Sequence, residues 1–491
     1  MNSIEMSDIN LKIKNKESFD FSFKYASKEN IMILNSIIAK LLSNLDRIFL
    51  LNSLVTVIRE IVVNAQKANA KRIFFRINNL DIKNPEQYKK GMSIFKENVI
   101  GEFDTFQEKI LNSDYYIKIL FSLIEDDLFI KVSNNSYIMP EELERINLRI
   151  QKALHYNDFS DAYNEIEDDT EGAGLGIVLT ILFLKNMGID PLLFKIESIK
   201  NITETSLLVP KALRPMNVTS KLKDQIIDDV KGIPTFPQNI MDLQRLCNDP
   251  NSTIDDISKK IMMDPALSSD VIKLSNSAGF VPGKRIETVN SAVMTIGLRN
   301  VNALLTAINA RKILSERYSK FEQIWDHCNK VAFYARQLGL ILRNQKIAEN
   351  SFLAGLLHDL GKIILLSADK KLVMKIADQV KERKIRTSTI MEEISIGISH
   401  SSIGELVAQK WNFPDYLIES IKHHHSPLSA SIEFKDIIYV VYLANMLVGI
   451  EERKYYFYYI EDMVLEKFTI TKEKEFSIFH EKIKKKYDMI K

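Results

Sequence analysis

Residues 349–365 read ENSFLAGLLHDLGKIIL, and this stretch decides how the second half of the chain is interpreted. Its apolar residues recur at intervals of three and four, which predicts a buried helix, and it contains the doublet His358-Asp359. From 217 to about 450 the spacing stays helical in short segments, with no convincing strand pattern. No proline occurs between Gly283 and Phe413. The second half is therefore predicted to be all-α.

Histidine is rare in this chain, and its distribution is uneven. Six of the eight histidines lie between residues 327 and 425. The two cysteines, Cys247 and Cys328, exclude a disulfide scaffold and a cysteine-rich metal site. The clustered histidines are therefore the first candidates for functional residues in the second half.

The first half of the chain mixes helical and strand patterns. Residues 30–70 have helical apolar spacing, which predicts two helices or one broken helix, and 71–79 (KRIFFRINN) predict a short strand. A hairpin is expected over 115–133, and an apolar helix with a glycine-rich start over 172–188. Two more strands are expected before Pro210. This order predicts an α+β sandwich of one mixed sheet and one helical layer.

Two small motifs in the first half suggest phosphate chemistry. Glu60 and Asn64 stand four residues apart, so on a helix they share one face and can reach one ligand, such as a hydrated Mg²⁺ ion. The same pair also fits a solvated helix edge. Gly172, Gly174 and Gly176 open the later helix, and closely spaced glycines there let backbone N–H groups approach phosphate oxygens.

Glu60-Ile-Val-Val-Asn64-Ala, followed by Gly172-Ala-Gly174-Leu-Gly176, resembles the ATP-binding fold of histidine kinases, type II topoisomerases and the large heat-shock chaperones, the GHKL family. The resemblance covers roughly 30–212 and implies ATP with Mg²⁺ as cofactor. It makes Glu60 the catalytic residue of an active ATPase site and Asn64 the ligand of Mg²⁺. The glycines would form the hinge of a phosphate-covering lid.

The sequence departs from this family at its middle motif. Alignment on Pro140-Glu141-Glu142-Leu143 puts Ser133 where the family has the aspartate that reads adenine, and Tyr137 at a glycine position. Serine lacks the charge-assisted hydrogen bond of an aspartate, although a slip of one residue would give that contact to Asn134. The earliest histidine is His155, so no phosphoacceptor histidine precedes this module in the sequence.

The second half is similar to the HDOD domains, a bacterial family related to HD phosphohydrolases. The resemblance covers about 230–450 and rests on ordered motifs, which are Ile233-Pro234, Asp249-Pro250, Asp264-Pro265-Ala266-Leu267, Leu274-Ser275-Asn276-Ser277-Ala278, His358-Asp359-Leu360-Gly361-Lys362, Trp411-Asn412-Phe413-Pro414 and His424-His425-Ser426-Pro427.

Catalytic HD enzymes bind metal through a histidine, a His-Asp doublet and a later aspartate, and the metal activates water for attack on phosphate. By resemblance, the candidate ligands of Fe, Mn or Zn are His327, His358, Asp359, His400, His424, His425 and Asn445. Asn445 stands where the final aspartate is expected, which removes one negative charge. The same histidines also fit a second role as buried hydrogen-bond anchors between helices.

Because each site has lost an aspartate, regulation is expected rather than catalysis. The sequence predicts a bacterial cytoplasmic signalling protein in which the ATPase-like module controls the HDOD domain, and the partner is another signalling protein. The alternatives are a metal-dependent phosphohydrolase acting on nucleotides or cyclic dinucleotides, and a GHKL-type ATPase or protein kinase acting in trans. The sequence leaves the oligomeric state open.

Composition and motifs together predict the domain organisation. The chain has 491 residues and a net charge of +2, so no charge-driven nucleic-acid or membrane partner is expected. No signal core and no uninterrupted apolar stretch of about 18 residues is present. The expected parts are an N-terminal extension (1–29), the GHKL-like module (30–212), a linker (213–230), the HDOD domain (231–450) and a helical tail (451–491).

Overall fold

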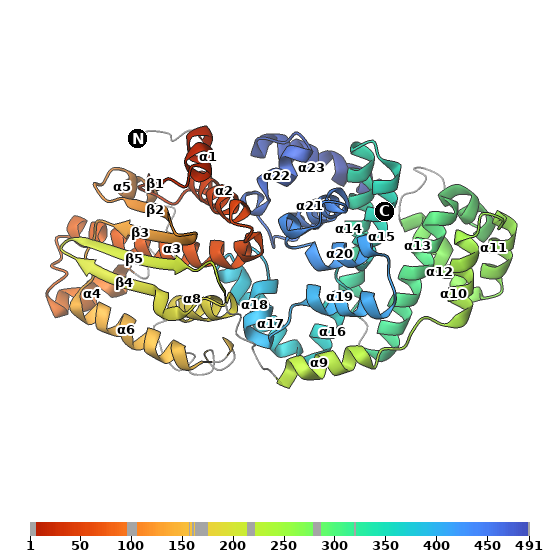
Figure 1. The fold of residues 1–491 in the computed structure, drawn as a ribbon, viewed down its shortest axis with the longest axis horizontal. Coiled ribbons are helices and arrows are strands. Elements are labelled where there is room, and N and C mark those ends of the chain that lie inside the picture. The colour runs from red at the N-terminus through yellow and green to blue at the C-terminus, as the bar shows by residue number, and fades with distance from the viewer. Residues whose placement is uncertain are drawn as a thin grey trace. The chain divides into compact units, whose positions relative to one another are not determined.

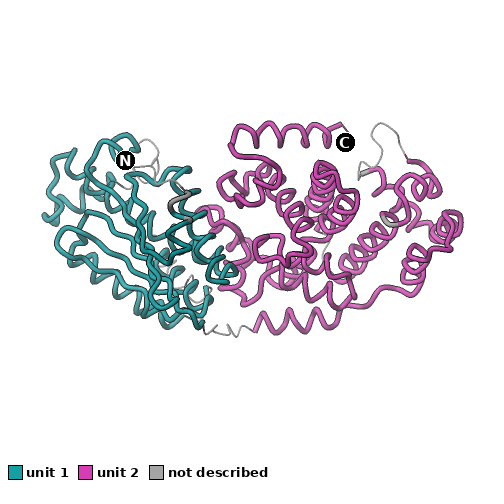
Figure 2. Tube along the Cα trace, turned by 45° about the horizontal axis from the view of Figure 1, so that its top comes forward, with its two compact units in different colours: residues 1–218 teal, residues 219–491 magenta. Residues whose placement is uncertain are grey.

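The computed structural model describes residues 6–95, 106–156, 158–159, 162, 175–213, 221–277, 286–318 and 321–489. The chain forms two compact units, 1–218 and 219–491 (Figure 2). The division falls within the predicted linker 213–230, whose later part is not a free linker because Lys221–Lys231 form helix α9. Each unit is described by itself.

The first unit contains one five-stranded sheet in the order β1-β2-β3-β5-β4, and every neighbouring pair is antiparallel (Figure 1). Its strands are β1 Phe19–Phe23, β2 Ile117–Ile124, β3 Asp127–Asn134, β4 Phe194–Ile199 and β5 Ile202–Val209. The prediction of a mixed sheet is wrong, and β1 lies in the stretch that was expected to be an N-terminal extension. The two predicted strand pairs are present as β2–β3 and β4–β5.

A tight turn fixes the register of the hairpin formed by β2 and β3. Glu125 and Asp126 both have positive φ, 53° and 77°, between the paired residues Ile124 and Asp127. Two consecutive left-handed residues match the twist of the flanking strands. Because side chains alternate across a strand, this register decides which of Ser133 and Asn134 faces the helices.

The helical layer of this unit is built around α3. Its helices are α1 Met6–Lys14, α2 Lys28–Asn44, α3 Leu51–Ile77, α4 Pro85–Phe95, α5 Gln107–Leu111, α6 Pro140–His155 and α8 Leu175–Asn186. The expected strand at 71–79 is wrong, because α3 continues to Ile77. Phe74 and Phe75 there bury their rings with Phe95 and Phe106, so tertiary packing overrides their local strand preference.

In the described residues of the second unit every regular element is a helix, as expected. Its helices are α9, α10 Gln238–Asn248, α11 Ile254–Met262, α12 Pro265–Ser277, α13 Val289–Arg317, α14 Glu322–Ile341, α15 Gln345–Leu357, α16 Leu360–Ala368, α17 Lys370–Glu382, α18 Thr389–Ile396, α19 His400–Lys410, α20 Asp415–His423, α21 Lys435–Glu451, α22 Asp462–Lys467 and α23 Glu473–Asp488. Together α14, α15, α16, α19, α20 and α21 position the candidate site.

Glycines let these central helices approach closely. A Cβ on Gly361 would lie 2.1 Å from the backbone oxygen of His400 and 2.5 Å from the backbone nitrogen of Gly404. A Cβ on Gly355 would lie 2.7 Å from Cα of Ala332. The backbones of α15 and α14, and those of α16 and α19, therefore come together at a distance that only glycine permits at these positions.

Two helical stretches are long and apolar enough to cross a membrane, Ile48–Ile77 and Gln345–Ala368, and a bent pair within 289–317 would make a third. The apolar windows of the first two are 56% and 78% buried inside the structure. The second stretch also carries Asp359 and Lys362, and charged groups are costly in a bilayer. Packing within each unit therefore accounts for much of this apolar surface.

Candidate metal centre

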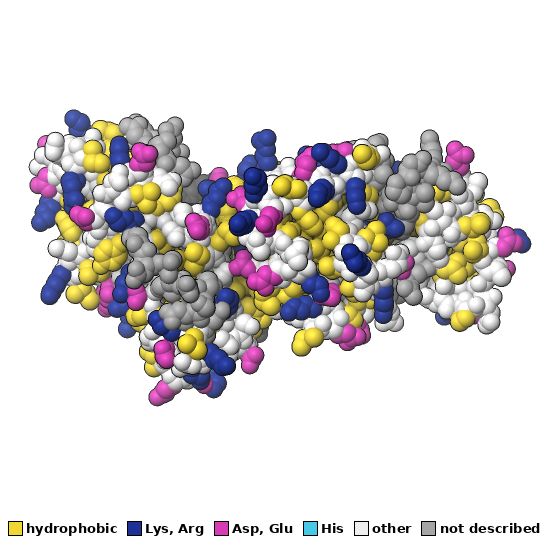
Figure 3. All heavy atoms as spheres, turned by 90° about the horizontal axis from the view of Figure 1, so that it is seen from above, with side chains coloured by type: hydrophobic (Ala, Val, Ile, Leu, Met, Phe, Trp, Pro, Cys, Tyr) yellow, Lys and Arg dark blue, Asp and Glu magenta, His cyan; other side chains and the backbone are white. Residues whose placement is uncertain are grey.

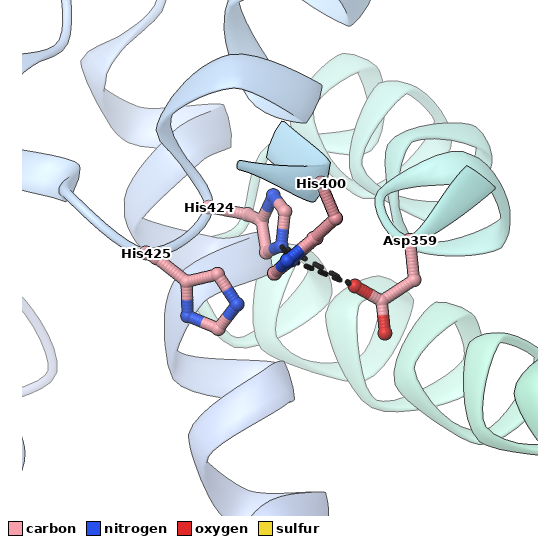
Figure 4. Close-up of side chains that lie close together, drawn as sticks. All are labelled: Asp359, His400, His424 and His425. Atoms are coloured by element: carbon pink, nitrogen blue, oxygen red, sulfur yellow. Dashed lines mark hydrogen bonds and ion pairs between the residues drawn. The ribbon is translucent and has the colours of Figure 1, made fainter. Parts of the chain in front are cut away.

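Five predicted ligands come together where four helix ends meet. His358 and Asp359 occupy the junction between α15 and α16, His400 begins α19, and His424 and His425 follow α20. Asp359, His400, His424 and His425 point toward one another in Figure 4. The side chains of His358, His400 and His424 are fully buried, and Asp359 is 2% exposed. Residues far apart in the sequence thus share one enclosed site.

The donor atoms of four of these residues form one compact set. Ligand atoms of Asp359, His400, His424 and His425 all lie within 4.8 Å of one another. Oδ1 of Asp359 is 3.3 Å from Nε2 of His400 and 3.5 Å from Nε2 of His424 (Figure 4). The two Nε2 atoms are 3.2 Å apart. Three imidazoles and one carboxylate form a ligand set suited to a divalent transition metal.

The other ring nitrogens explain why the Nε2 atoms can act as ligands. Nδ1 of His358 donates to the carbonyl oxygen of Gly355 over 2.8 Å, and Nδ1 of His424 donates to that of Ile421 over 2.7 Å. Nδ1 of His400 lies 2.7 Å from a carboxylate oxygen of Glu392. A proton on Nδ1 leaves the Nε2 lone pair for a metal, and such outer contacts hold metal-binding imidazoles in place.

A second donor set shares Asp359 and lies toward α14. Nε2 of His358 and Nε2 of His327 are 3.7 and 4.0 Å from Oδ2 of Asp359. Nε2 of His327 is also 3.2 Å from Oδ1 of Asn445, and its Nδ1 is 3.0 Å from Glu452. Asn445 therefore lies beside the set, but as a neutral amide it is a weaker ligand than a carboxylate.

A lysine already neutralises the shared carboxylate on the side of the second set. Nζ of Lys362 donates to Oδ2 of Asp359 over 3.0 Å. Burial opposes the charge of Lys362, but the adjacent Asp359 carboxylate outweighs it and raises the lysine pKa. The two oxygens of Asp359 thus have different partners. Oδ1 faces His400 and His424, and Oδ2 faces Lys362. This division favours one metal, bound in the first set.

Without a metal, a proton can hold the first set together. Burial lowers the pKa of His400, but the Glu392 carboxylate opposes burial and the net effect raises it to about 9. Burial lowers the pKa of His358 and of His424. The charged His400 would then lie between the carboxylates of Glu392 and Asp359, and a metal at Nε2 would take the place of one proton.

This arrangement gives a pH prediction for the metal-free protein. The folded-state pKa of His400, about 9, lies above its ordinary 6.5, so its stabilisation is complete below pH 6.5 and is lost as pH rises toward 9. Urea unfolding of chelator-treated protein should give a lower free energy of unfolding at pH 9 than at pH 6.5. The decrease should be smaller in His400→Gln, and an equal decrease in both proteins would contradict this assignment.

Sequence reasoning missed the outer residues of the site. Lys362 lies three residues after Asp359 in the HDLGK motif, so its position was visible but its contact was not. Glu392 precedes His400 and Glu452 follows Asn445 in the sequence. Neither separation matches a spacing that would indicate a contact with a metal ligand. His423 does not join the cluster, and its Nδ1 lies 3.2 Å from Ser426.

The first unit contains a cavity of about 630 Å³ between α3 and the sheet. Asn64 lines it from α3, and Asn134 and Thr203 line it from the strands. Ser133 is not among the lining residues, because the alternation of β3 turns its hydroxyl toward Glu204, 3.4 Å away. Of Ser133 and its alternative Asn134, only Asn134 therefore lines the cavity.

The structure describes only some of the remaining residues that were predicted to bind nucleotide. Gly176 packs against Glu60, since a Cβ at this glycine would lie 1.9 Å from Oε1 of the glutamate. Gly172 and Gly174 lie outside the described residues. Two of the predicted residues, Asn64 and the alternative Asn134, are thus brought to one cavity, and Glu60 faces the start of α8.

Comparison with known proteins identifies the class of this protein. The HDOD domain family matches residues 233–427, so the helical unit contains an HDOD domain. An uncharacterized protein of Treponema pallidum (strain Nichols) is 32% identical over 391 residues, which is 80% of this chain and 76% of that protein. The chain belongs to the same family as the Treponema protein.

Solved structures resemble about half of the chain. One is an HDOD domain protein of unknown function from Geobacter sulfurreducens, with 20% identity and a TM-score of 0.45 over 55% of this chain and 96% of that one. Another, from Shewanella amazonensis, is provisionally named a phosphohydrolase and has 23% identity and a TM-score of 0.42 over 55% of this chain and 97% of that one.

Proposed function

We propose that this protein is a bacterial cytoplasmic signalling protein that acts through contacts with another signalling protein. In this proposal the first unit binds a small-molecule ligand and the HDOD unit is the output. The HD residues hold one structural metal that stabilises the output unit. Figure 3 shows Lys and Arg interspersed with Asp and Glu over one face, which supports a protein partner more than nucleic acid or membrane.

The observation that carries the structural role is the enclosure of the first donor set. Asp359, His400 and His424 are at most 2% exposed, and with His425 they supply four ligands. Four protein ligands complete a tetrahedral site, whereas catalytic sites keep a position open for water or substrate. A mixture of imidazole and carboxylate favours Zn²⁺, with Fe or Mn as alternatives.

The two sets around Asp359 favour one alternative, a metal-dependent phosphohydrolase on nucleotides or cyclic dinucleotides. Protein loaded with Zn²⁺, Mn²⁺ or Fe²⁺ should therefore be incubated with cyclic dinucleotides and nucleoside triphosphates. Our proposal expects no hydrolysis above a metal-only control. Hydrolysis that disappears in His358→Ala would establish the enzyme instead.

For the first unit we propose ATP with Mg²⁺ as the ligand, because the cavity brings Asn64 near Asn134 and Thr203. Isothermal titration should show Mg·ATP binding to the full chain, and Asn64→Ala should weaken it at least tenfold through loss of a metal ligand. Lys90→Gln is the control, because this exposed residue does not line the cavity. Absence of binding by ATP, ADP and GTP, with and without Mg²⁺, would remove this part of the proposal.

ATP turnover distinguishes the other alternative, an ATPase or a kinase that acts on a partner in trans. We expect binding without turnover, because Glu60, the catalytic residue that the resemblance implies, packs against Gly176 and is not among the residues that line the cavity. Steady hydrolysis of Mg·ATP that is abolished by Glu60→Gln would favour the alternative.

A further inference from the structure

The wall of the first-unit cavity formed by α3, α4 and α6 has an excess of positive charge. Lys71, which lines the cavity, and Arg72, which lines a separate pocket, both form ion pairs with Glu142, the latter over 3.3 Å. The side chains of Lys71 and Glu142 are 14% exposed and that of Arg72 is 6% exposed. Tyr88 on α4 also donates to Glu142 over 2.9 Å. One carboxylate thus serves two enclosed cations and a phenol.

The hydrogen bonds of this cluster are also incomplete. Nε and Nη1 of Arg72 are buried and have no acceptor within the described residues, while its Nη2 donates to the carbonyl oxygen of Tyr137 and to Glu142. Burial opposes the charge of Glu142, but Lys71 and Arg72 outweigh it and lower the glutamate pKa to about 2. Glu142 is therefore fully ionised and still leaves the cluster short of negative charge and acceptors.

Further cations continue this wall toward solvent. Lys71, Lys89 and Arg145 line the cavity, and the last two are exposed. Lys89 has no ion-pair partner in the described parts of the chain. Lys71 follows Asn64 by seven residues, which is about two turns, or roughly 10 Å, along the same face of α3. The cationic wall is therefore separate from the position of Asn64.

Helix α4 belongs to the segment 80–112, which is polar and carries no motif that indicates a function. Gly91 lets it lie against Phe75, because a Cβ there would be 2.6 Å from that ring. This contact directs Tyr88, Lys89 and Met92 into the cavity wall. Elsewhere the cavity is lined by apolar residues such as Ile138, Phe194 and Ile196. The cavity thus combines an apolar wall with a cationic one.

We propose that Lys71, Lys89 and Arg145 form an oxyanion subsite that holds a phosphate or carboxylate group of the ligand, about two helical turns from Asn64. The ligand is therefore a small anion with an apolar or planar body. Glu142 and Tyr88 orient Lys71 for this contact. This proposal rests on the proposed role of the cavity as a ligand site, and it assigns α4 as the element that selects the anionic ligand.

The test measures thermal unfolding of the full chain with sulfate, phosphate or succinate at constant ionic strength. Wild-type protein should show a saturable rise in Tm, and Lys89→Gln/Arg145→Gln should need at least tenfold more anion because two charge-assisted contacts are lost. Both residues are exposed, so the variant should fold. A rise in Tm with sulfate and phosphate but not with succinate would identify a phosphate-type group. A rise with succinate alone would identify a carboxylate.

Lys90→Gln is the matched control, since it removes one exposed charge from α4 outside the cavity lining. The same anion response in wild type and in the double variant would overturn the subsite. If Mg·ATP still binds to a protein that gives this result, the nucleotide proposal stands without the oxyanion subsite. If the anion response is lost only in the double variant while no nucleotide binds, the subsite stands and the nucleotide proposal fails.

Discussion

Replacement of Asp359 by alanine is expected to lower the free energy of unfolding of the HDOD unit by about 3–5 kcal/mol. The carboxylate is 2% exposed and lies 3.0 Å from Nζ of Lys362 and 3.3 Å from Nε2 of His400. Its removal leaves the partly buried ammonium of Lys362 without this counter-ion. In metal-bound protein the loss should be larger, because a ligand of the proposed metal is removed as well.

Urea denaturation followed by circular dichroism measures this effect, with and without chelator. Asp378→Ala is the control, because that carboxylate is exposed on α17 and its removal should change stability by less than about 0.5 kcal/mol. If Asp359→Ala is as stable as the control, Asp359 is not the centre of a buried charge network.

Gly361→Ala should destabilise the same unit by about 3 kcal/mol or more, or prevent its folding. The added methyl group would meet the backbone of His400 at 2.1 Å and that of Gly404 at 2.5 Å, so α16 and α19 would have to separate. That separation would also displace His400 from Asp359. Metal content should therefore decrease together with stability.

Gly232→Ala provides the matched comparison in the same unit. A Cβ on Gly232 would meet chiefly the flexible end of Arg317, 2.9 Å away, and that side chain can move. Its melting temperature should change little. Equal melting temperatures for Gly361→Ala and Gly232→Ala would show that the close approach of α16 and α19 is not required.

The HDOD part could be predicted from sequence because its motifs mark helix ends that meet. The doublet His358-Asp359 and the later His400 and His424 were all expected as ligands, and the structure brings them together. The match over 233–427 confirms the family. Glu392 and Lys362 could not be assigned roles, since their contacts depend on how α16, α18 and α19 pack.

The first unit was harder to predict because its local patterns compete with packing. KRIFFRINN looked like a strand, yet α3 extends to Ile77 and buries Phe74 and Phe75 against the segment that contains α4. The strand β1 is only five residues long, too short for its pattern to distinguish it from the predicted N-terminal extension. One residue of register on β3 decides between Ser133 and Asn134, and sequence alignment alone does not fix that register.

The central claim is that the HD residues enclose one structural metal, and element analysis tests it most directly. Protein purified without chelator should contain one transition metal per chain, resistant to brief dialysis against chelator and absent from Asp359→Ala. Wild-type protein that folds with full stability and contains no stoichiometric transition metal, even after incubation with Zn²⁺, Fe²⁺ or Mn²⁺, would contradict the claim.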